Sequence, residues 1–199
     1  MQGRTLRNNT DFKIGKWVYS DFNSKMDSIV EYVNYNNKPY VNQFWLRTFN
    51  RDTIIGRGNY FDVYTEADLI SKFVKVRFIL FEPALGEDSD IMVIIPKDDK
   101  ELNSDFSNLF EIESDTLKSY ENDGIERTGL PDGLQINHIS DFGINYEESG
   151  RHKIRGVLIE FKDKKQKDGR VNESNEKLER RMFFDVTVNP KAAPSAIKT

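Results

Sequence analysis

Residues 73–81 read FVKVRFILF, and this stretch decides the fold class. Apolar side chains take every second place around the basic residues Lys75 and Arg77. A period of two is the pattern of a β-strand that buries one face and exposes the other. The sequence therefore predicts a half-buried strand here, in a protein that is mainly β.

Segments on both sides of this stretch have a similar composition. They are rich in β-branched and aromatic residues, which favour strands, and they cover residues 41–49, 60–65, 91–95, 151–161 and 181–188. Turn residues separate them without long helices in between, which favours an antiparallel β-sandwich over a βαβ sheet. Within the fourth segment the apolar phase changes at Gly156, which predicts a β-bulge at that glycine.

The N-terminal part is predicted to contain an α-helix. Its apolar residues recur at the helical spacing, with Ser20 or Asp21 placed as the N-cap. The residues that share this spacing are Phe22, Met26, Ile29, Val30 and Val33. We therefore expect a helix over residues 21–33, ended by the asparagine-rich turn that follows it.

Three regions are expected along the chain. A helical segment over residues 1–40 packs on or precedes the sandwich, the antiparallel sandwich covers residues 41–190, and residues 191–199 form a disordered tail. Residues 162–180 are expected to form a long charged hairpin loop between the last two strands.

Composition excludes several classes of function. The chain has 199 residues, 29 Lys and Arg, 33 Asp and Glu, two histidines and no cysteine. A net charge of −4 argues against a general affinity for nucleic acid, which depends on clustered positive charge. Without cysteine there is no disulfide, thiol nucleophile or thiolate metal site. No apolar run approaches the roughly 20 residues that span a bilayer.

The charge is divided between two segments. Residues 82–126 hold fourteen acidic and three basic residues, a net charge of −11, whereas residues 151–199 have a net charge of +6. As solvated loops and strand faces, these segments would attract each other within the fold. The alternative is an acidic surface that faces a partner or holds cations weakly.

No catalytic, cofactor or metal-binding residue is predicted. His138 and His152 lie in separate segments without a metal-ligand spacing, and we interpret both as structural. The acidic clusters do not fit a calcium loop, and no G-x-S-x-G motif is present. Gly56-Arg57-Gly58 lacks the third glycine of a dinucleotide site and is interpreted as a turn. A pair of catalytic carboxylates that meet only in the fold stays open.

Aromatic residues provide the candidate binding surface. Tyr32, Tyr35 and Tyr40 bracket the asparagine-rich turn, and Trp45 lies just beyond it. Exposed aromatic side chains anchor protein interfaces and stack on sugars, so these four residues are candidates for a partner or glycan surface. The alternative for Trp45, and for Trp17, is packing in the core.

Two parts of the chain resemble a group of exported proteins. Residues 149–161, SGRHKIRGVLIEF, and residues 181–188, RMFFDVTV, resemble the last two strands of immunoglobulin-like domains in exported Bacteroidota proteins. Residues 58–64, GNYFDVY, with residues 73–81, are similar to strands of gliding-motility and type IX secretion-associated envelope proteins. The resemblance implies an immunoglobulin-like sandwich in a periplasmic or outer-membrane-associated protein.

A second feature agrees with that resemblance. Ser28, Thr53 and Thr116 each follow an aspartate and precede an aliphatic residue, as in the acceptor pattern of Bacteroidota periplasmic O-glycosylation. The alternative is that they are ordinary helix and loop residues. Many such envelope proteins are lipoproteins, and because this chain has no cysteine, a lipid anchor would depend on a residue outside it. The first ten residues lack the apolar core of a signal peptide, so a cytoplasmic location is the alternative to a processed form.

The favoured hypothesis is a noncatalytic envelope module that binds or assembles with another envelope protein through surface recognition. One alternative is a carbohydrate-binding module or glycosidase-like enzyme that uses exposed aromatic and acidic residues. The other is a structural subunit of a phage or secretion machine. No cofactor is expected under any of the three.

Overall fold

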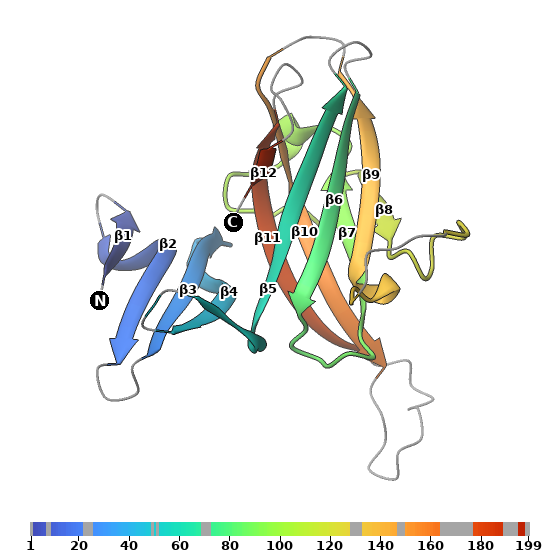
Figure 1. Ribbon diagram of the computed structural model, residues 1–199. Helices are drawn as coiled ribbons and strands as arrows, with labels where there is room; N and C mark the ends of the chain where they lie inside the picture. Colours follow the sequence, from blue (N-terminus) through green and yellow to red (C-terminus); the bar gives the residue numbers. More distant parts are fainter. Residues whose placement is uncertain are drawn as a thin grey trace.

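The computed structural model contains two antiparallel β-sheets and, over the residues it describes, no α-helix (Figure 1). It describes residues 2–6, 9–21, 26–48, 50, 52–68, 73–127, 133–146, 150–163, 177–188 and 195–197. The mainly β, antiparallel architecture predicted from the sequence is confirmed.

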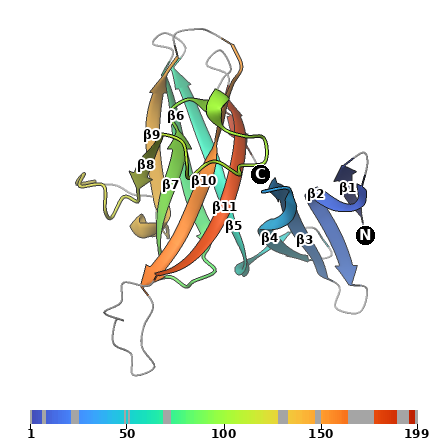
Figure 2. The same cartoon turned by 180° about the vertical axis from the view of Figure 1, so that it is seen from behind.

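The larger sheet has eight strands in the order β1-β2-β3-β4-β5-β6-β9, with β12 paired to β5. Its strands are β1 (Gln2–Leu6), β2 (Asn9–Asp21), β3 (Met26–Tyr35), β4 (Lys38–Thr48), β5 (Thr53–Asp68), β6 (Phe73–Glu82), β9 (Ile139–Asn145) and β12 (Ser195–Ile197). We call β1 to β4 the meander. Both views place it beside the rest of the molecule (Figures 1 and 2).

The smaller sheet has four strands in the order β11-β10-β7-β8. They are β7 (Asp90–Pro96), β8 (Ser114–Lys118), β10 (His152–Asp163) and β11 (Lys177–Val188). Two short 3₁₀ turns, η1 (Asp99–Glu101) and η2 (Ile136–His138), lie in the connections. β10 and β11 pair without interruption from His152 opposite Val188 to Asp163 opposite Lys177. Residues 162–163 and 177–180 of the predicted loop therefore belong to these strands, and the rest of that loop lies outside the described residues.

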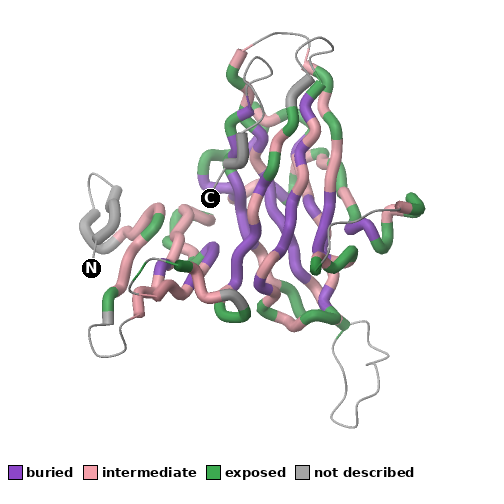
Figure 3. Tube along the Cα trace, in the orientation of Figure 1, coloured by how far each residue is buried: buried purple, intermediate pink, exposed green. Residues whose placement is uncertain are grey.

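The core lies between the two sheets. Val74, Val76 and Phe78 of β6 are fully buried and form one cluster with Leu158 of β10 and Met182 of β11. Figure 3 shows that buried residues run through the middle of both sheets. The strand predicted from FVKVRFILF therefore buries the face that its alternation indicated.

The predicted bulge at Gly156 is wrong. β10 keeps its register with β11 through this residue, and its pairing with β7 begins at the next one, with Val157 opposite Ile94. A Cβ atom at Gly156 would lie 2.2 Å from the carbonyl oxygen of Ile94, so the glycine permits a close approach between strands. The apolar phase changes because β10 is covered on both faces. On its outer side Val157 and Ile159 pack with Leu109 from the loop after β7.

The predicted helix over residues 21–33 is also wrong. Asp21 is the last residue of β2, and the rest of the described part of this segment belongs to β3, which pairs with β2 on one side and β4 on the other. Both faces of β3 carry apolar residues, so the sequence shows no simple alternation and the spacing of Ile29 and Val33 imitates a helical face. Asn36 and Asn37 have φ angles of 51° and 58°, and they form the two-residue turn of a β-hairpin instead of ending a helix.

β5 is shared between two neighbours along one edge. Its first part pairs with β4, from Thr53 to Asn59, and β12 pairs with the same strand further on, from Val63 to Thr65. The other residues of the predicted C-terminal tail lie outside the described residues. No helix in the described part of the chain is long and apolar enough to cross a membrane.

Candidate interaction site

The meander presents apolar and aromatic residues on the face that points away from the sandwich. Strand register defines this face, because residues paired across neighbouring strands share one side of a sheet. One row joins Trp17, Val30 and Phe44, and the next joins Tyr19, Ser28 and Leu46. A third row joins Gly15, Tyr32 and Val41. We call these three rows the outer face.

The outer face is only partly covered. Its residues are half-buried, apart from Val41, which is 44% exposed. None of the buried clusters formed by the described residues includes a member of these rows. By contrast, the row on the opposite face joins Val18, Ile29 and Trp45, and it packs on Tyr60 and Phe81. A small β-sheet with apolar residues on both faces has one face available for a partner.

Lys13 lies at the centre of the aromatic group. Its ammonium nitrogen lies 5.2 Å from the ring centroid of Trp17, 5.1 Å from that of Tyr19 and 5.4 Å from that of Tyr32. It also donates a hydrogen bond of 2.8 Å to the hydroxyl of Tyr19. These distances lie in the range of cation–π attraction. The result is a positive charge held on an aromatic surface.

The two tyrosine hydroxyls beside Lys13 differ in acidity. Their oxygens are 3.1 Å apart. Burial alone would raise the pKa of Tyr19, but the hydrogen bonds with Lys13 and Tyr32 and the positive charge of Lys13 bring it below the ordinary value. Burial and the hydrogen bond with Tyr19 raise the pKa of Tyr32 to about 12. Lys13 thus polarises Tyr19 in preference to Tyr32.

The four aromatic residues singled out in the sequence do not form one surface. Tyr32 lies on the outer face, and Trp45 is 5% exposed against Tyr60 on the opposite face, with 5.7 Å between ring centroids. Tyr35 and Tyr40 pack around Phe183 of β11, with centroid distances of 4.6 Å and 5.5 Å. Only Tyr32 joins Lys13, and the sequence analysis missed Lys13 and Tyr19. The alternation of residues 12–19, FKIGKWVY, is the signal that could have located them.

The first part of β4 connects the meander to the edge of the smaller sheet. The Asn42 side chain donates to the carbonyl oxygen of Phe183 and accepts from its backbone N–H, over 2.8 Å and 2.6 Å. Arg180 of β11 donates to the carbonyl oxygens of Val41 and Asn42 over 2.9 Å and 2.8 Å. These bonds hold β4 against β11, the edge strand of the smaller sheet.

A cavity of about 200 Å³ lies beside this junction of β4 with β11. Its polar end is formed by Glu31, Asn42 and Gln43. Its apolar wall includes Phe61 and Val63 of β5 and Phe184 and Val186 of β11. We call it the seam cavity. No sequence signal pointed to Glu31, because a single acidic residue in an apolar segment has no pattern of its own.

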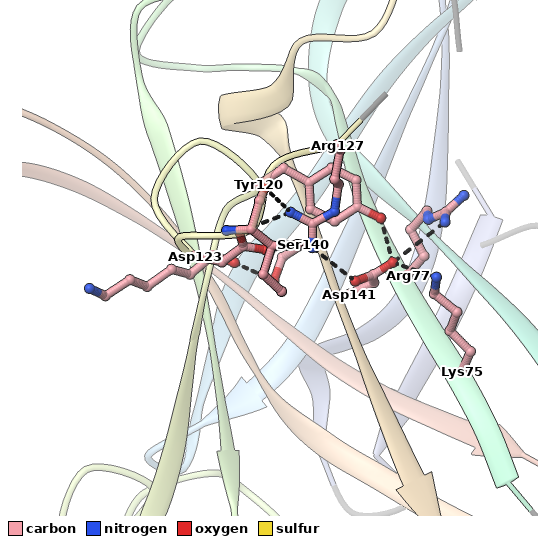
Figure 4. Close-up of polar contacts among 9 residues, drawn as sticks. Lys75, Arg77, Tyr120, Asp123, Arg127, Ser140 and Asp141 are labelled. Atoms are coloured by element: carbon pink, nitrogen blue, oxygen red, sulfur yellow. Dashed lines mark hydrogen bonds and ion pairs between the residues drawn. The ribbon is translucent and has the colours of Figure 1, made fainter. Parts of the chain in front are cut away.

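A third cluster surrounds Asp141 of β9 (Figure 4). Lys75, Arg77 and Arg127 have nitrogen atoms 3.0, 3.4 and 3.8 Å from its carboxylate, and the Tyr120 hydroxyl donates to it. Burial alone would raise the pKa of Asp141, but the bonds from Tyr120 and Lys75 and the nearby positive charges lower it. Arg127 also stacks on the Tyr120 ring, 3.6 Å from its centroid. We interpret the cluster as an anchor that holds residues 120–127 against β6 and β9.

A buried serine, histidine and glutamate lie together but lack the order of a catalytic triad. The Ser89 hydroxyl donates to Glu160 over 2.9 Å and lies 3.1 Å from Nε2 of His138. Serine therefore stands between the acid and the base, whereas a triad needs the histidine in that place. All three side chains are buried. Glu160 also accepts from the backbone N–H groups of Ala84 and Leu85, which marks it as a structural acceptor.

The three predicted modification sites lie on different strands. Thr116 is exposed on β8, an edge strand of the smaller sheet, and Thr53 is half-buried at the start of β5. Ser28 is half-buried on the outer face of β3 rather than on a helix. Accessibility is therefore greatest at Thr116.

Comparison with protein-family models, with curated proteins and with solved structures finds no match to this chain. Over the residues the structure describes, no group of three or more histidine and acidic side chains is arranged to hold a metal ion.

Proposed function

We propose that this chain is a noncatalytic recognition module of the bacterial cell envelope that binds another protein through the outer face of the meander. The observation that carries the proposal is the partly covered group of Trp17, Tyr19 and Tyr32 around the ammonium of Lys13. Aromatic residues are enriched at the centres of protein interfaces because they bury a large area with few rotatable bonds.

The charge of Lys13 defines the chemistry of the partner. Among the residues whose side chains the structure describes, no carboxylate forms an ion pair with Lys13, and its contacts there are three rings and one hydroxyl. An interface that covered it without a counter-charge would leave the ammonium desolvated and unpaired. We therefore propose a partner surface that is apolar with a carboxylate at its centre.

The envelope assignment has separate support. It rests on the resemblance to exported Bacteroidota domains and on the acceptor pattern at Ser28, Thr53 and Thr116. The exposure of Thr116 makes modification there sterically feasible. We also propose that the two packed sheets are an immunoglobulin-like sandwich to which the meander is an addition. Fractionation of native cells, together with the intact mass of the purified protein and of Thr116→Ala, tests the location and the modification.

Site-specific photocrosslinking tests the recognition function. A photoreactive phenylalanine analogue replaces Leu46 on the outer face and, as a matched control, Phe110, which is 45% exposed on the loop over the smaller sheet. We expect one heterologous adduct in native cells from position 46 and not from position 110. With the purified partner, Tyr32→Ala and Lys13→Met should each weaken binding by about tenfold or more.

Two results would count against protein recognition. One is the same set of abundant proteins crosslinked from both positions, which would indicate random collision. The other is binding to a glycan array that depends on Trp17 without any protein adduct, which would support the carbohydrate-binding alternative.

A further inference from the structure

The seam cavity contains a carboxylate whose neighbours use only part of its bonding capacity. Asn42 and Gln43 donate to the same oxygen of Glu31, Oε2, over 2.7 Å and 3.0 Å. No other donor among the described residues contacts this carboxylate. A carboxylate can accept about four hydrogen bonds, so Oε1 retains acceptor capacity.

The amides beside Glu31 have little capacity left to offer a ligand. Asn42 uses one N–H on Glu31 and the other on the carbonyl of Phe183, while its own oxygen accepts from the Phe183 N–H. The side-chain oxygen of Gln43 accepts from the backbone N–H of Phe61 over 3.0 Å. The polar end of the cavity therefore presents an acceptor and a negative charge, and a ligand must bring donors.

The basic residue paired with Glu31 in the strand register does not neutralise it by contact. Lys16 stands opposite Glu31 in the pairing of β2 with β3, yet its ammonium lies over the Trp45 ring, 4.5 Å from the centroid, and forms no ion pair with Glu31. A second carboxylate, Asp185, lies on the cavity rim and is paired with Lys153 over 3.0 Å. Of the two charged residues in the lining, Glu31 is thus the one without an ion pair among the described residues, and its charge favours a cation.

The remaining walls determine the size and polarity of the part of the ligand that lies beyond its cationic group. Phe61, Phe184 and Val186 offer apolar surface, and the volume of about 200 Å³ is below the usual size of a drug-binding pocket. Such a space suits a short alkyl chain, and aromatic rings add attraction for a cation near their faces.

We propose that the seam cavity binds a primary alkylammonium group, with the ammonium on Oε1 of Glu31 and the alkyl chain against the apolar wall formed by Phe61, Phe184 and Val186. The group can belong to a free amine or to a lysine side chain of another protein. This site is separate from the outer face, so it stands or fails independently of the proposed recognition function.

Titration of the full-length protein with n-pentylammonium chloride tests the proposal, and n-pentanol serves as the neutral ligand of similar shape. We expect a dissociation constant on the order of 1 mM, in keeping with the affinity open to a ligand of this size. NMR should show shifts at the methyl groups of Val63 and Val186. Intermolecular NOEs to the rings of Phe61 and Phe184 place the ligand without any substitution.

Two substitutions distinguish a role of the Glu31 carboxylate in binding from a role of Asp185 on the cavity rim. Glu31→Gln keeps an oxygen for Asn42 and Gln43 but removes the charge, and it should weaken pentylammonium binding by about tenfold or more. Asp185→Asn is the matched control and should change the affinity by less than about twofold. Equal affinity for pentanol and pentylammonium, or full affinity in Glu31→Gln, would overturn the proposal, as would the absence of these NOEs at saturating ligand.

The source of the ammonium group is decided by a third ligand, Nα-acetyl-lysine methylamide. Binding of both this compound and pentylammonium indicates that a lysine of a partner protein can enter the cavity. Binding of pentylammonium alone indicates that a free amine is the ligand. Either result supports the alkylammonium site.

Discussion

Asn42 and Phe183 join the two sheets of this protein across 141 residues of sequence, through two hydrogen bonds between one side chain and one backbone unit. The primary amide of Asn42 takes the place of a strand residue at the edge of β11. Both partners are buried, Asn42 at 1% exposure and Phe183 at 1%. The bonds therefore form away from water, where unpaired polar groups are costly.

Substitution Asn42→Ala should lower the free energy of unfolding by about 2 to 4 kcal/mol, because it leaves the N–H and C=O of Phe183 unpaired. Urea unfolding followed by circular dichroism measures the loss. Asn145→Ala, at an exposed position on β9, is the control and should change stability by no more than about 0.5 kcal/mol. Equal effects of the two substitutions would show that Asn42 does not hold the sheets together.

How far the sequence predicts this fold depends on how each strand is buried. β6 and β11 alternate clearly along most of their length, with Ile79 and Phe183 as the buried residues on the opposite face, so their pattern indicates strands. Each of the six predicted strand segments overlaps a β-strand, and Arg151 is the one described residue of these segments that lies outside a strand. β3 and β10 carry apolar residues on both faces, and in each case the pattern was misread, as a helix and as a bulge. In β10 the second apolar face is covered by a distant segment, and in β3 it is only partly covered. Local periodicity reveals neither arrangement.

The candidate sites were less predictable than the fold. Tyr32 was found from its residue type, whereas the Lys13 cluster depends on the register of β2 against β3. The seam cavity depends on contacts between β4 and β11 that are far apart in sequence. Such sites are set by strand register and strand crossing, which single-sequence patterns do not contain.

Substitution Lys13→Met should raise the pKa of Tyr19, because it removes a hydrogen bond and a positive charge that favour the phenolate. A titration followed by the ¹³C shift of the tyrosine Cζ atoms measures the change. Lys16→Met, on the opposite face and over Trp45, is the matched control and should leave the Tyr19 titration unchanged. If the Tyr19 pKa stays the same without Lys13, the polarised cluster on the outer face does not exist in solution.

Substitution Asp141→Asn should destabilise the protein by about 1 to 3 kcal/mol at pH 7, because the carboxylate forms charge-assisted bonds with Tyr120 and Lys75. The folded state lowers the pKa of Asp141. The stabilisation is therefore present above the unfolded pKa near 3.8 and is lost as pH falls through the lower folded pKa. Urea unfolding of both proteins at pH 7 and pH 3 should show the difference shrinking in acid. A difference that stays constant would mean that shape, not charge, is the important property of Asp141.

His138 provides a separate pH test, because it is buried beside Ser89 and near Glu160, Glu87 and Asp90. Burial lowers its pKa below 6.5, although the nearby carboxylates act in the opposite direction. Below pH 6.5 this histidine binds a proton in the unfolded chain but not in the folded protein. The free energy of unfolding therefore falls as pH decreases from 7.5 to 5.5. The loss from this one group is at most about 1.4 kcal/mol over that interval. The pKa values of Asp105, Asp123 and Asp141 are all lowered from 3.8, so these carboxylates stay charged throughout it. Urea unfolding between pH 7.5 and 5.5 measures how the free energy of unfolding changes with pH. His138→Asn should remove the part of this change that His138 causes. An unchanged slope in this variant would show that His138 does not control the acid sensitivity of the fold.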